Sequence, residues 1–301
     1  KQDEKEEKKE KNVKKHQPQE NEDKKDKKAK KAEKEEEDVK EVKEDKKKRT
    51  EELKNRHLLF GPINKVTLLE AQGRIMHSLA TGNKNFNLFA GASAAAQALK
   101  IGHALELIET QTLYALDNYF QTLFEQARKE QSKAVKNLVA NAEFNNAYIQ
   151  TKNLISQNLE HPKLLELKDL IENKIKDNPK AKIIVFSQYR NTAALISKKL
   201  NEISNVKTKV FIGQAKKLGQ GLSQKEQKQV LNEFSNGEIN VICATSIGEE
   251  GLDIPEVNKV IFYEPVPSEI RKIQRTGRTA RLIPGELIML ITKNTRDESF
   301  H

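Results

Sequence analysis

The stretch NVICATSIGEEGLDIPEVNKVIFYE, from Asn240 to Glu264, contains two short apolar runs joined by a polar, glycine-rich segment. Each run has the length and the β-branched content that are typical of a buried strand. Similar runs lie outward from it on both sides, KIIVFS and TKVFIG before it and GELIMLIT after it. Helical patterns separate them, namely NTAALISKKLNEI, SQKEQKQVLNEFSNG and SEIRKIQRTG. This alternation predicts an α/β fold in which helices cover both faces of a parallel sheet.

Two regions of different character precede this α/β part, which we assign to residues 179–301. Residues 57–178 repeat apolar side chains at helical spacing, which predicts an all-α domain. Residues 1–56 are dominated by Lys and Glu and offer too little apolar surface to offset the entropy of ordering a chain. We therefore expect a charged low-complexity tail or linker there, either disordered or forming a solvated helix with ion pairs at helical spacing.

The charge and the cysteine content narrow the class of protein. Residues 1–50 hold 20 basic and 17 acidic side chains, so +7 of the net charge of +10 belongs to residues 51–301. A basic folded part suggests a polyanionic partner such as nucleic acid. The single cysteine, Cys243, excludes an intramolecular disulfide and a cysteine-rich zinc site, and it fits a reducing intracellular location. No run of about 20 apolar residues predicts a membrane span, so we expect no membrane partner.

Polar residues follow the predicted strands. Gln188 and Arg190 come after KIIVFS, and Thr245 and Ser246 come after NVICA. The carboxyl ends of parallel strands meet at one edge of a sheet, where such folds bind their ligands. Glu249 and Glu250 in the following turn could suggest a metal or an acid–base pair, but a solvated turn explains them as well, and we predict no metal ligands in this chain.

Three segments carry a resemblance to a known family. IIVFSQYR, ATSIGEEGLDIP and QRTGRTAR resemble motifs IV, V and VI of superfamily 2 helicases, in the same order. The longer string from Gly219 to Arg281 is most similar to the archaeal Hef helicases and to the Fanconi-anaemia group M helicases. Residues 57–178 are similar to the thumb-like helical insertion of these proteins. The resemblance implies that residues 179–301 form the C-terminal RecA-like lobe.

The resemblance also implies an ATP site shared between two lobes. Arg278 and Arg281 match the arginines that reach the γ-phosphate, a task that suits a permanently charged planar guanidinium. Gln274, Gly251 and Asp253 match residues near the nucleotide and its ribose. Ala280 stands where motif VI usually has glycine, which changes the local turn by one methyl group.

On the nucleic-acid side, the resemblance implies that four residues contact the phosphate backbone of DNA. They are Gln188, Arg190, Thr245 and Ser246. The implied enzyme is an ATP-dependent DNA helicase or translocase that acts on forked or branched DNA, at a junction of single strand and duplex, in repair. Its cofactor is ATP with Mg²⁺, and a nuclease domain or a clamp protein is a further expected partner. Such a protein is cytoplasmic in an archaeal cell and nuclear in a eukaryote.

The sequence lacks the phosphate-binding motif GxxxxGK(S/T) and a strand-end Asp-Glu pair. We therefore expect the phosphate loop and the Mg²⁺ ligands on an upstream lobe, and no ATP turnover by residues 1–301 alone. Two other readings stay open at this point. The chain could be a non-catalytic nucleic-acid binding module, or an RNA-directed relative, because RIG-I-like RNA sensors share a similar motif V and insertion.

Overall fold

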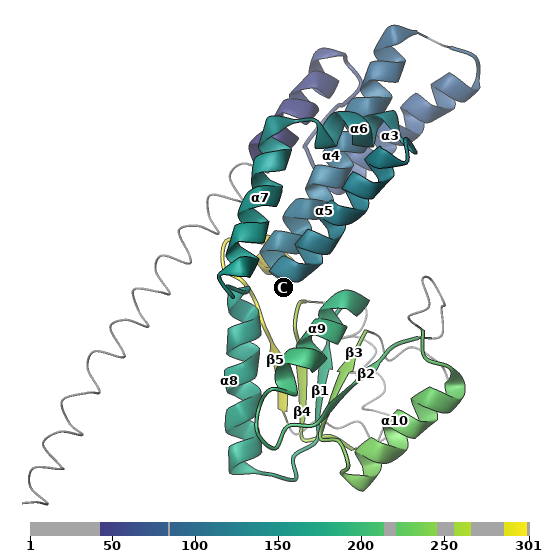
Figure 1. The fold of residues 1–301 in the computed structure, drawn as a ribbon. Helices are drawn as coiled ribbons and strands as arrows, with labels where there is room; N and C mark the ends of the chain where they lie inside the picture. The colour runs from purple at the N-terminus through teal and green to yellow at the C-terminus, as the bar shows by residue number, and fades with distance from the viewer. Residues whose placement is uncertain (1–42, 84, 214–220, 246–255, 266–285, 300–301) are drawn as a thin grey trace, which may run out of the picture. The chain divides into compact units, whose positions relative to one another are not determined.

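The computed structural model describes residues 43–83, 85–213, 221–245, 256–265 and 286–299. It divides into two compact units, Lys1–Ile101 with Asn137–Gln150, and Gly102–Lys136 with Thr151–His301. A helical region precedes a parallel sheet with flanking helices, which confirms the predicted fold class, a RecA-like α/β lobe after an all-α region. Figure 1 shows the helices and strands of both units.

The second unit is built on a five-stranded sheet in the order β2-β3-β1-β4-β5. All four strand pairs are parallel, and Val185 at the centre of β1 pairs with Cys243 on one side and Ile261 on the other. Parallel strands need crossover connections, and the helices at Arg190–Leu200 and Gln224–Asn236 lie in those from β1 to β2 and from β2 to β3. The strands are β1 (Ile183–Phe186), β2 (Thr208–Phe211), β3 (Val241–Ala244), β4 (Lys259–Phe262) and β5 (Glu286–Met289).

The helices of the described chain have the following bounds. They are α3 (Lys65–Ala80), α4 (Phe86–Thr110), α5 (Leu113–Arg128), α6 (Lys133–Val139), α7 (Ala142–Ser156), α8 (Pro162–Asp177), α9 (Arg190–Leu200), α10 (Gln224–Asn236) and α12 (Arg296–Ser299). A further helix covers residues 43–55. Sequence signals explain both ends of α10. Ser223 and Glu226 form a capping box at the start of α10, and Gly237 ends that helix with a φ of 78°.

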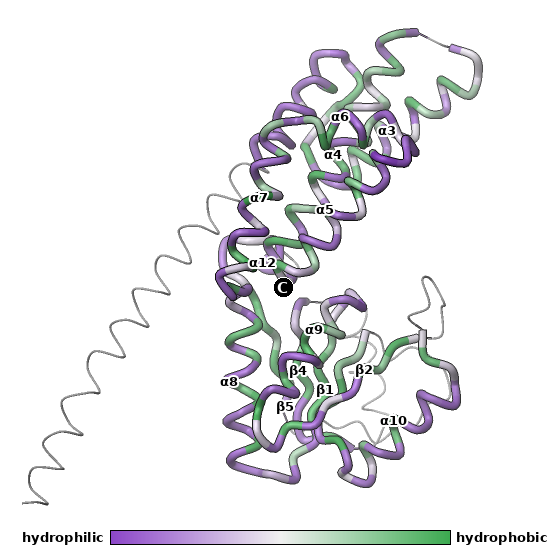
Figure 2. Tube along the Cα trace, viewed as in Figure 1, coloured by the Kyte–Doolittle hydropathy of each residue, from purple (hydrophilic) through white to green (hydrophobic). Residues whose placement is uncertain are grey.

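Two apolar cores lie on opposite faces of the sheet, because successive strand residues point to opposite faces. Val185, Cys243 and Ile261 pack on one face with α8 and α9. Phe186 and Phe262 pack on the other face with residues of α10, and their rings lie 5.4 Å apart. Figure 2 shows the alternation of hydrophobic and hydrophilic residues along α8 that this packing requires. The central strands are buried on both faces, which is why their sequences are apolar except for Lys259 at the start of β4.

The first unit has its own apolar core. Leu53, Leu68 and Ile75 are almost completely buried there, together with alanines of the first half of α4. Leu53 belongs to the helix at residues 43–55, which lies before the boundary that we predicted between residues 56 and 57. Of the two alternatives for the charged tail, the structure shows a helix for these thirteen residues, and its apolar side chain at position 53 explains why this end packs.

Candidate nucleic-acid and nucleotide site at the strand ends

Three of the predicted DNA contacts lie at the carboxyl ends of adjacent strands. Gln188 follows β1 and is exposed, Arg190 is the first residue of α9, and Thr245 follows β3. Backbone hydrogen bonds fix these ends to each other, since Ser187 donates its N–H to the carbonyl of Ala244 at 2.9 Å. The structure therefore brings Gln188, Arg190 and Thr245 to one edge, as the strand pattern predicts.

The start of α9 lies at this edge. Tyr189 is the N-cap residue, and its side chain makes no capping hydrogen bond. The first N–H groups of a helix have no partner within the helix and carry a partial positive charge, so they favour an anion. Together with the guanidinium of Arg190, this end of α9 suits a phosphate group.

Glu264 is a buried carboxylate at the same edge. The sequence analysis did not identify it as a candidate site residue. It lies two residues after β4, and its Oε1 accepts hydrogen bonds from the backbone N–H of Gln188 and from the Ser187 hydroxyl, the latter at 3.3 Å. Burial raises the pKa of Glu264 to about 7, although the Gln188 N–H and the charge of Lys163 act in the opposite direction. The one available signal was a charged residue directly after the apolar run KVIFY.

The raised pKa of Glu264 predicts a pH dependence of stability. Because the pKa rises from 4.5 to about 7 on folding, the folded state holds the proton more tightly, and this stabilisation is lost as the pH rises through 7. The slope contributed by one group is at most about 1.4 kcal/mol per pH unit. We expect Glu264→Gln to remove this slope between pH 5 and 7 in urea unfolding experiments. Parent and variant curves of equal slope over that range would contradict the prediction.

A buried ion pair lies near this edge. Lys163 in the first turn of α8 pairs with Asp297 of α12, and its Nζ also donates to the carbonyl of Thr110 at 3.3 Å. Lys163 Nζ lies 5.5 Å from the centre of the Tyr263 ring. Burial lowers the pKa of Lys163, while the Asp297 carboxylate raises it. The pair connects the end of α4, α8 and α12 beside the strand ends.

The remaining predicted site residues lie outside the residues that the structure describes. They are Ser246, Gly251, Asp253, Gln274, Arg278 and Arg281. Both segments that contain them follow strands at the edge described above, one after Thr245 and one after Pro265. Their roles toward ATP and DNA stay predictions.

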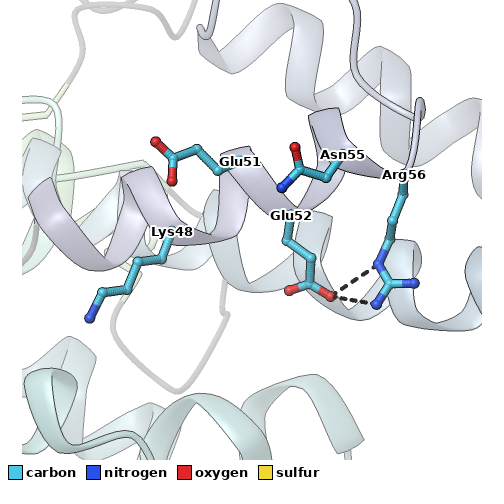
Figure 3. A pocket seen from close by; sticks show the side chains of 5 residues that line it. All are labelled: Lys48, Glu51, Glu52, Asn55 and Arg56. Carbon is cyan, nitrogen blue, oxygen red and sulfur yellow. Dashed lines mark hydrogen bonds and ion pairs between the residues drawn. The ribbon is translucent and has the colours of Figure 1, made fainter.

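A shallow depression lies elsewhere, in the first unit. Figure 3 shows its lining by Lys48, Glu51, Glu52, Asn55 and Arg56. Arg56 pairs with Glu52 at 3.2 Å and donates to Asn87 at 3.0 Å. No predicted site residue lines it, and its basic and acidic groups balance, so we assign no ligand to it.

Neither a metal-binding cluster nor a membrane-spanning helix is present in the part of the chain that the structure describes. No cluster of three or more His, Cys, Asp or Glu side chains within those ranges is arranged to hold a metal ion. Within the same ranges, no helix combines the length and the apolarity needed to cross a membrane.

The chain matches two family models that follow each other without a gap. Residues 33–161 match the model described as "Putative ATP-dependent RNA helicase, helical bundle". Residues 162–283 match the model described as "Helicase conserved C-terminal domain". These two matches meet at residue 161, close to the start of α8.

A solved structure and several curated proteins are similar to this chain. The crystal structure of the Pyrococcus furiosus Hef helicase domain superposes with a TM-score of 0.72 at 41% identity, covering 88% of this chain and 55% of that one. "Putative ATP-dependent RNA helicase MJ1505" of Methanocaldococcus jannaschii is 42% identical over 205 residues, which are 68% of this chain and 25% of the relative. "DEAD-box ATP-dependent RNA helicase FANCM" of Arabidopsis thaliana is 41% identical over 158 residues, 50% of this chain and 12% of the relative. The chain thus spans a quarter or less of these two curated relatives.

Proposed function

We propose that this chain, which carries the C-terminal RecA-like lobe and the helical bundle of the Hef and FANCM type of superfamily 2 helicases, is part of an ATP-dependent DNA translocase. In this proposal it supplies arginine fingers and DNA contacts to an ATP site shared with an upstream lobe, and it acts on forked or branched DNA in repair. The observation that supports the DNA contacts most directly is the position of Gln188, Arg190 and Thr245 at adjacent strand ends.

The described residues suit the backbone of a nucleic-acid strand. Arg190 offers a fork of N–H donors to phosphate oxygens, Gln188 is exposed beside it, and Thr245 adds a hydroxyl. Contacts of this kind position a strand without reading its sequence, as a translocase that moves along DNA requires. The net charge of +7 on residues 51–301 favours the same partner.

On the nucleotide side, Gln274, Gly251 and Asp253 would hold ATP, and Arg278 and Arg281 would face its γ-phosphate. Bound ATP with Mg²⁺ would supply the γ-phosphoryl group, whose transfer to water releases ADP and drives movement, and the arginines would stabilise the charge that develops during the transfer. The Mg²⁺ ligands are assigned to the upstream lobe.

The proposed phosphate contact predicts a change in the salt dependence of binding. Arg190→Ala in the full-length protein should weaken fork-DNA binding and reduce the slope of log K against log salt concentration by about 1. Fluorescence anisotropy at several salt concentrations measures both quantities. Lys198→Ala is the matched control, because it removes one exposed positive charge from the last turn of the same helix. Equal slopes for the two variants would contradict the contact.

The choice of DNA over RNA needs its own test, because the curated relatives include proteins named as DNA helicases and as RNA helicases. "ATP-dependent DNA helicase mph1" of Neurospora crassa is 41% identical over 147 residues, 48% of this chain and 13% of the relative. In competition at fixed salt, fork DNA should displace duplex RNA at the lower concentration. Tighter binding of RNA would favour an RNA-directed relative. DNA binding without DNA-stimulated ATP hydrolysis by the full-length protein would favour a non-catalytic binding module.

A further inference from the structure

Two polar side chains at or just after the end of α4 accept hydrogen bonds from Tyr189 and Thr192, which flank Arg190. The Tyr189 hydroxyl donates to Glu106 Oε1 at 2.9 Å, and the Thr192 hydroxyl donates to Gln111 Oε1 at 2.9 Å. Glu106 lies in the last turn and a half of α4, and Gln111 directly follows that helix. All four residues belong to the same compact unit.

The Thr192–Gln111 bond lies in the interior. Thr192 is fully buried and Gln111 is 1% exposed, so neither group can exchange its partner for water. Gln111 makes two further contacts. Its side-chain Nε2 donates to the Thr110 hydroxyl at 3.2 Å, and its backbone carbonyl accepts from the Tyr263 hydroxyl at 3.5 Å. The Gln111 amide thus presents its oxygen to α9 in a fixed orientation.

The segment around Arg190 is held from a second direction. Glu264, after β4, accepts the N–H of Gln188. Three of the five residues from Gln188 to Thr192 are therefore hydrogen-bonded to groups far away in the sequence. Apolar packing alone would tolerate a rotation of the first turn of α9. The hydrogen bonds made by Tyr189 and Thr192 are directional, so they oppose such a rotation.

We propose that Glu106 and Gln111 are positioning residues that fix the first turn of α9, and with it Arg190, in the orientation that binds the DNA backbone. This inference rests on the proposed function, and it assigns to the helical bundle a direct influence on the DNA contacts of the lobe. A shift of the end of α4 changes the geometry of both hydrogen bonds, so it changes the orientation of Arg190.

Two conservative substitutions in the full-length protein test the proposal. Tyr189→Phe and Thr192→Val each remove one hydroxyl and keep the size of the side chain. The fork-DNA concentration that gives half-maximal ATPase stimulation should rise roughly 3- to 30-fold for each variant. Tyr114→Phe and Thr122→Val remove the same hydroxyls from exposed positions of α5, and they should stay within about twofold of the parent.

A double variant and a melting curve separate positioning from a merely structural role. Gln111→Leu with Thr192→Val should raise the required DNA concentration no more than Thr192→Val does, because the two groups act as one pair. Variants with a lower melting temperature but an unchanged DNA concentration for half-maximal stimulation would overturn the proposal. Variants that match a DNA-stimulated parent in both melting temperature and DNA concentration would overturn it as well. A parent that DNA does not stimulate would overturn the proposed function and this inference with it.

Discussion

Arg281→Ala in the full-length protein is expected to lower DNA-stimulated ATP hydrolysis by roughly 10³- to 10⁵-fold, the range that arginine fingers contribute in other nucleotidases. The reason is that a guanidinium binds two oxygens of the transferring phosphoryl group while its charge builds up, and alanine leaves that charge uncompensated. Steady-state hydrolysis at saturating fork DNA measures the loss. Binding of labelled ATP should change much less, because the finger acts mainly in the transition state.

Two further variants make this test specific to the finger. Arg275→Ala removes the same charge from the same segment, and we assign it no contact with the γ-phosphate, so it should retain hydrolysis within about tenfold of the parent. Arg281→Lys keeps the charge but not the planar fork, so it should rescue little of the lost rate. A rate for Arg281→Ala within a few-fold of the parent would remove Arg281 from the proposed mechanism.

Lys163→Met is expected to reduce the free energy of unfolding by about 3–5 kcal/mol, the usual cost of leaving one member of a buried ion pair without its partner. The Asp297 carboxylate is 1% exposed and pairs with Lys163, so in the variant it has to be protonated or carry an uncompensated charge. Chemical denaturation of the full-length protein, followed by circular dichroism, measures the change in stability.

The structure offers a matched control and a compensating change for this variant. Lys176→Met removes an exposed ion pair with Glu172 four residues earlier in α8, and it should cost no more than about 0.5 kcal/mol. Adding Asp297→Asn to Lys163→Met should restore most of the lost stability, because asparagine leaves no unpaired charge. The backbone N–H of Thr292 donates to Asp297 Oδ2 at 2.9 Å, and the asparagine side-chain oxygen can still accept this hydrogen bond. Equal losses for Lys163→Met and Lys176→Met would contradict the prediction.

The sheet could be predicted from the sequence because local patterns determine its strands. KIIVFS, TKVFIG, NVICAT, KVIFYE and GELIMLIT contain β1, β2, β3, β4 and β5. Each contains a short apolar run, and the runs are most continuous in the central strands β1, β3 and β4, which are buried, whereas the edge strands β2 and β5 are partly exposed. The position of Gln188, Arg190 and Thr245 at one edge followed from the same pattern, since parallel strands align their carboxyl ends.

The supporting side chains could not be predicted in the same way. Gln111 and Thr192 are 81 residues apart, and Ser187 and Glu264 are 77 residues apart. The sequence around each of these residues does not distinguish it from a polar residue on the surface of a helix or loop. Their role depends on strand order and on where α4 ends, which are long-range properties. For residues 43–55 the sequence allowed either disorder or a solvated helix, but it did not predict that the helix packs into a core, because the apolar Leu53 stands among many Lys and Glu residues.

Cys243, in the middle of β3, gives this chain a useful experimental property. Its side chain is completely buried, and burial raises the pKa of its thiol, so the reactive thiolate is scarce in the folded state. A cysteine introduced at the exposed position 188 would therefore react with a maleimide dye while the native thiol stays silent. Delayed modification of Cys243 would report opening of the sheet, so one labelling experiment follows both the edge that we assign to DNA and the integrity of the strand beside it.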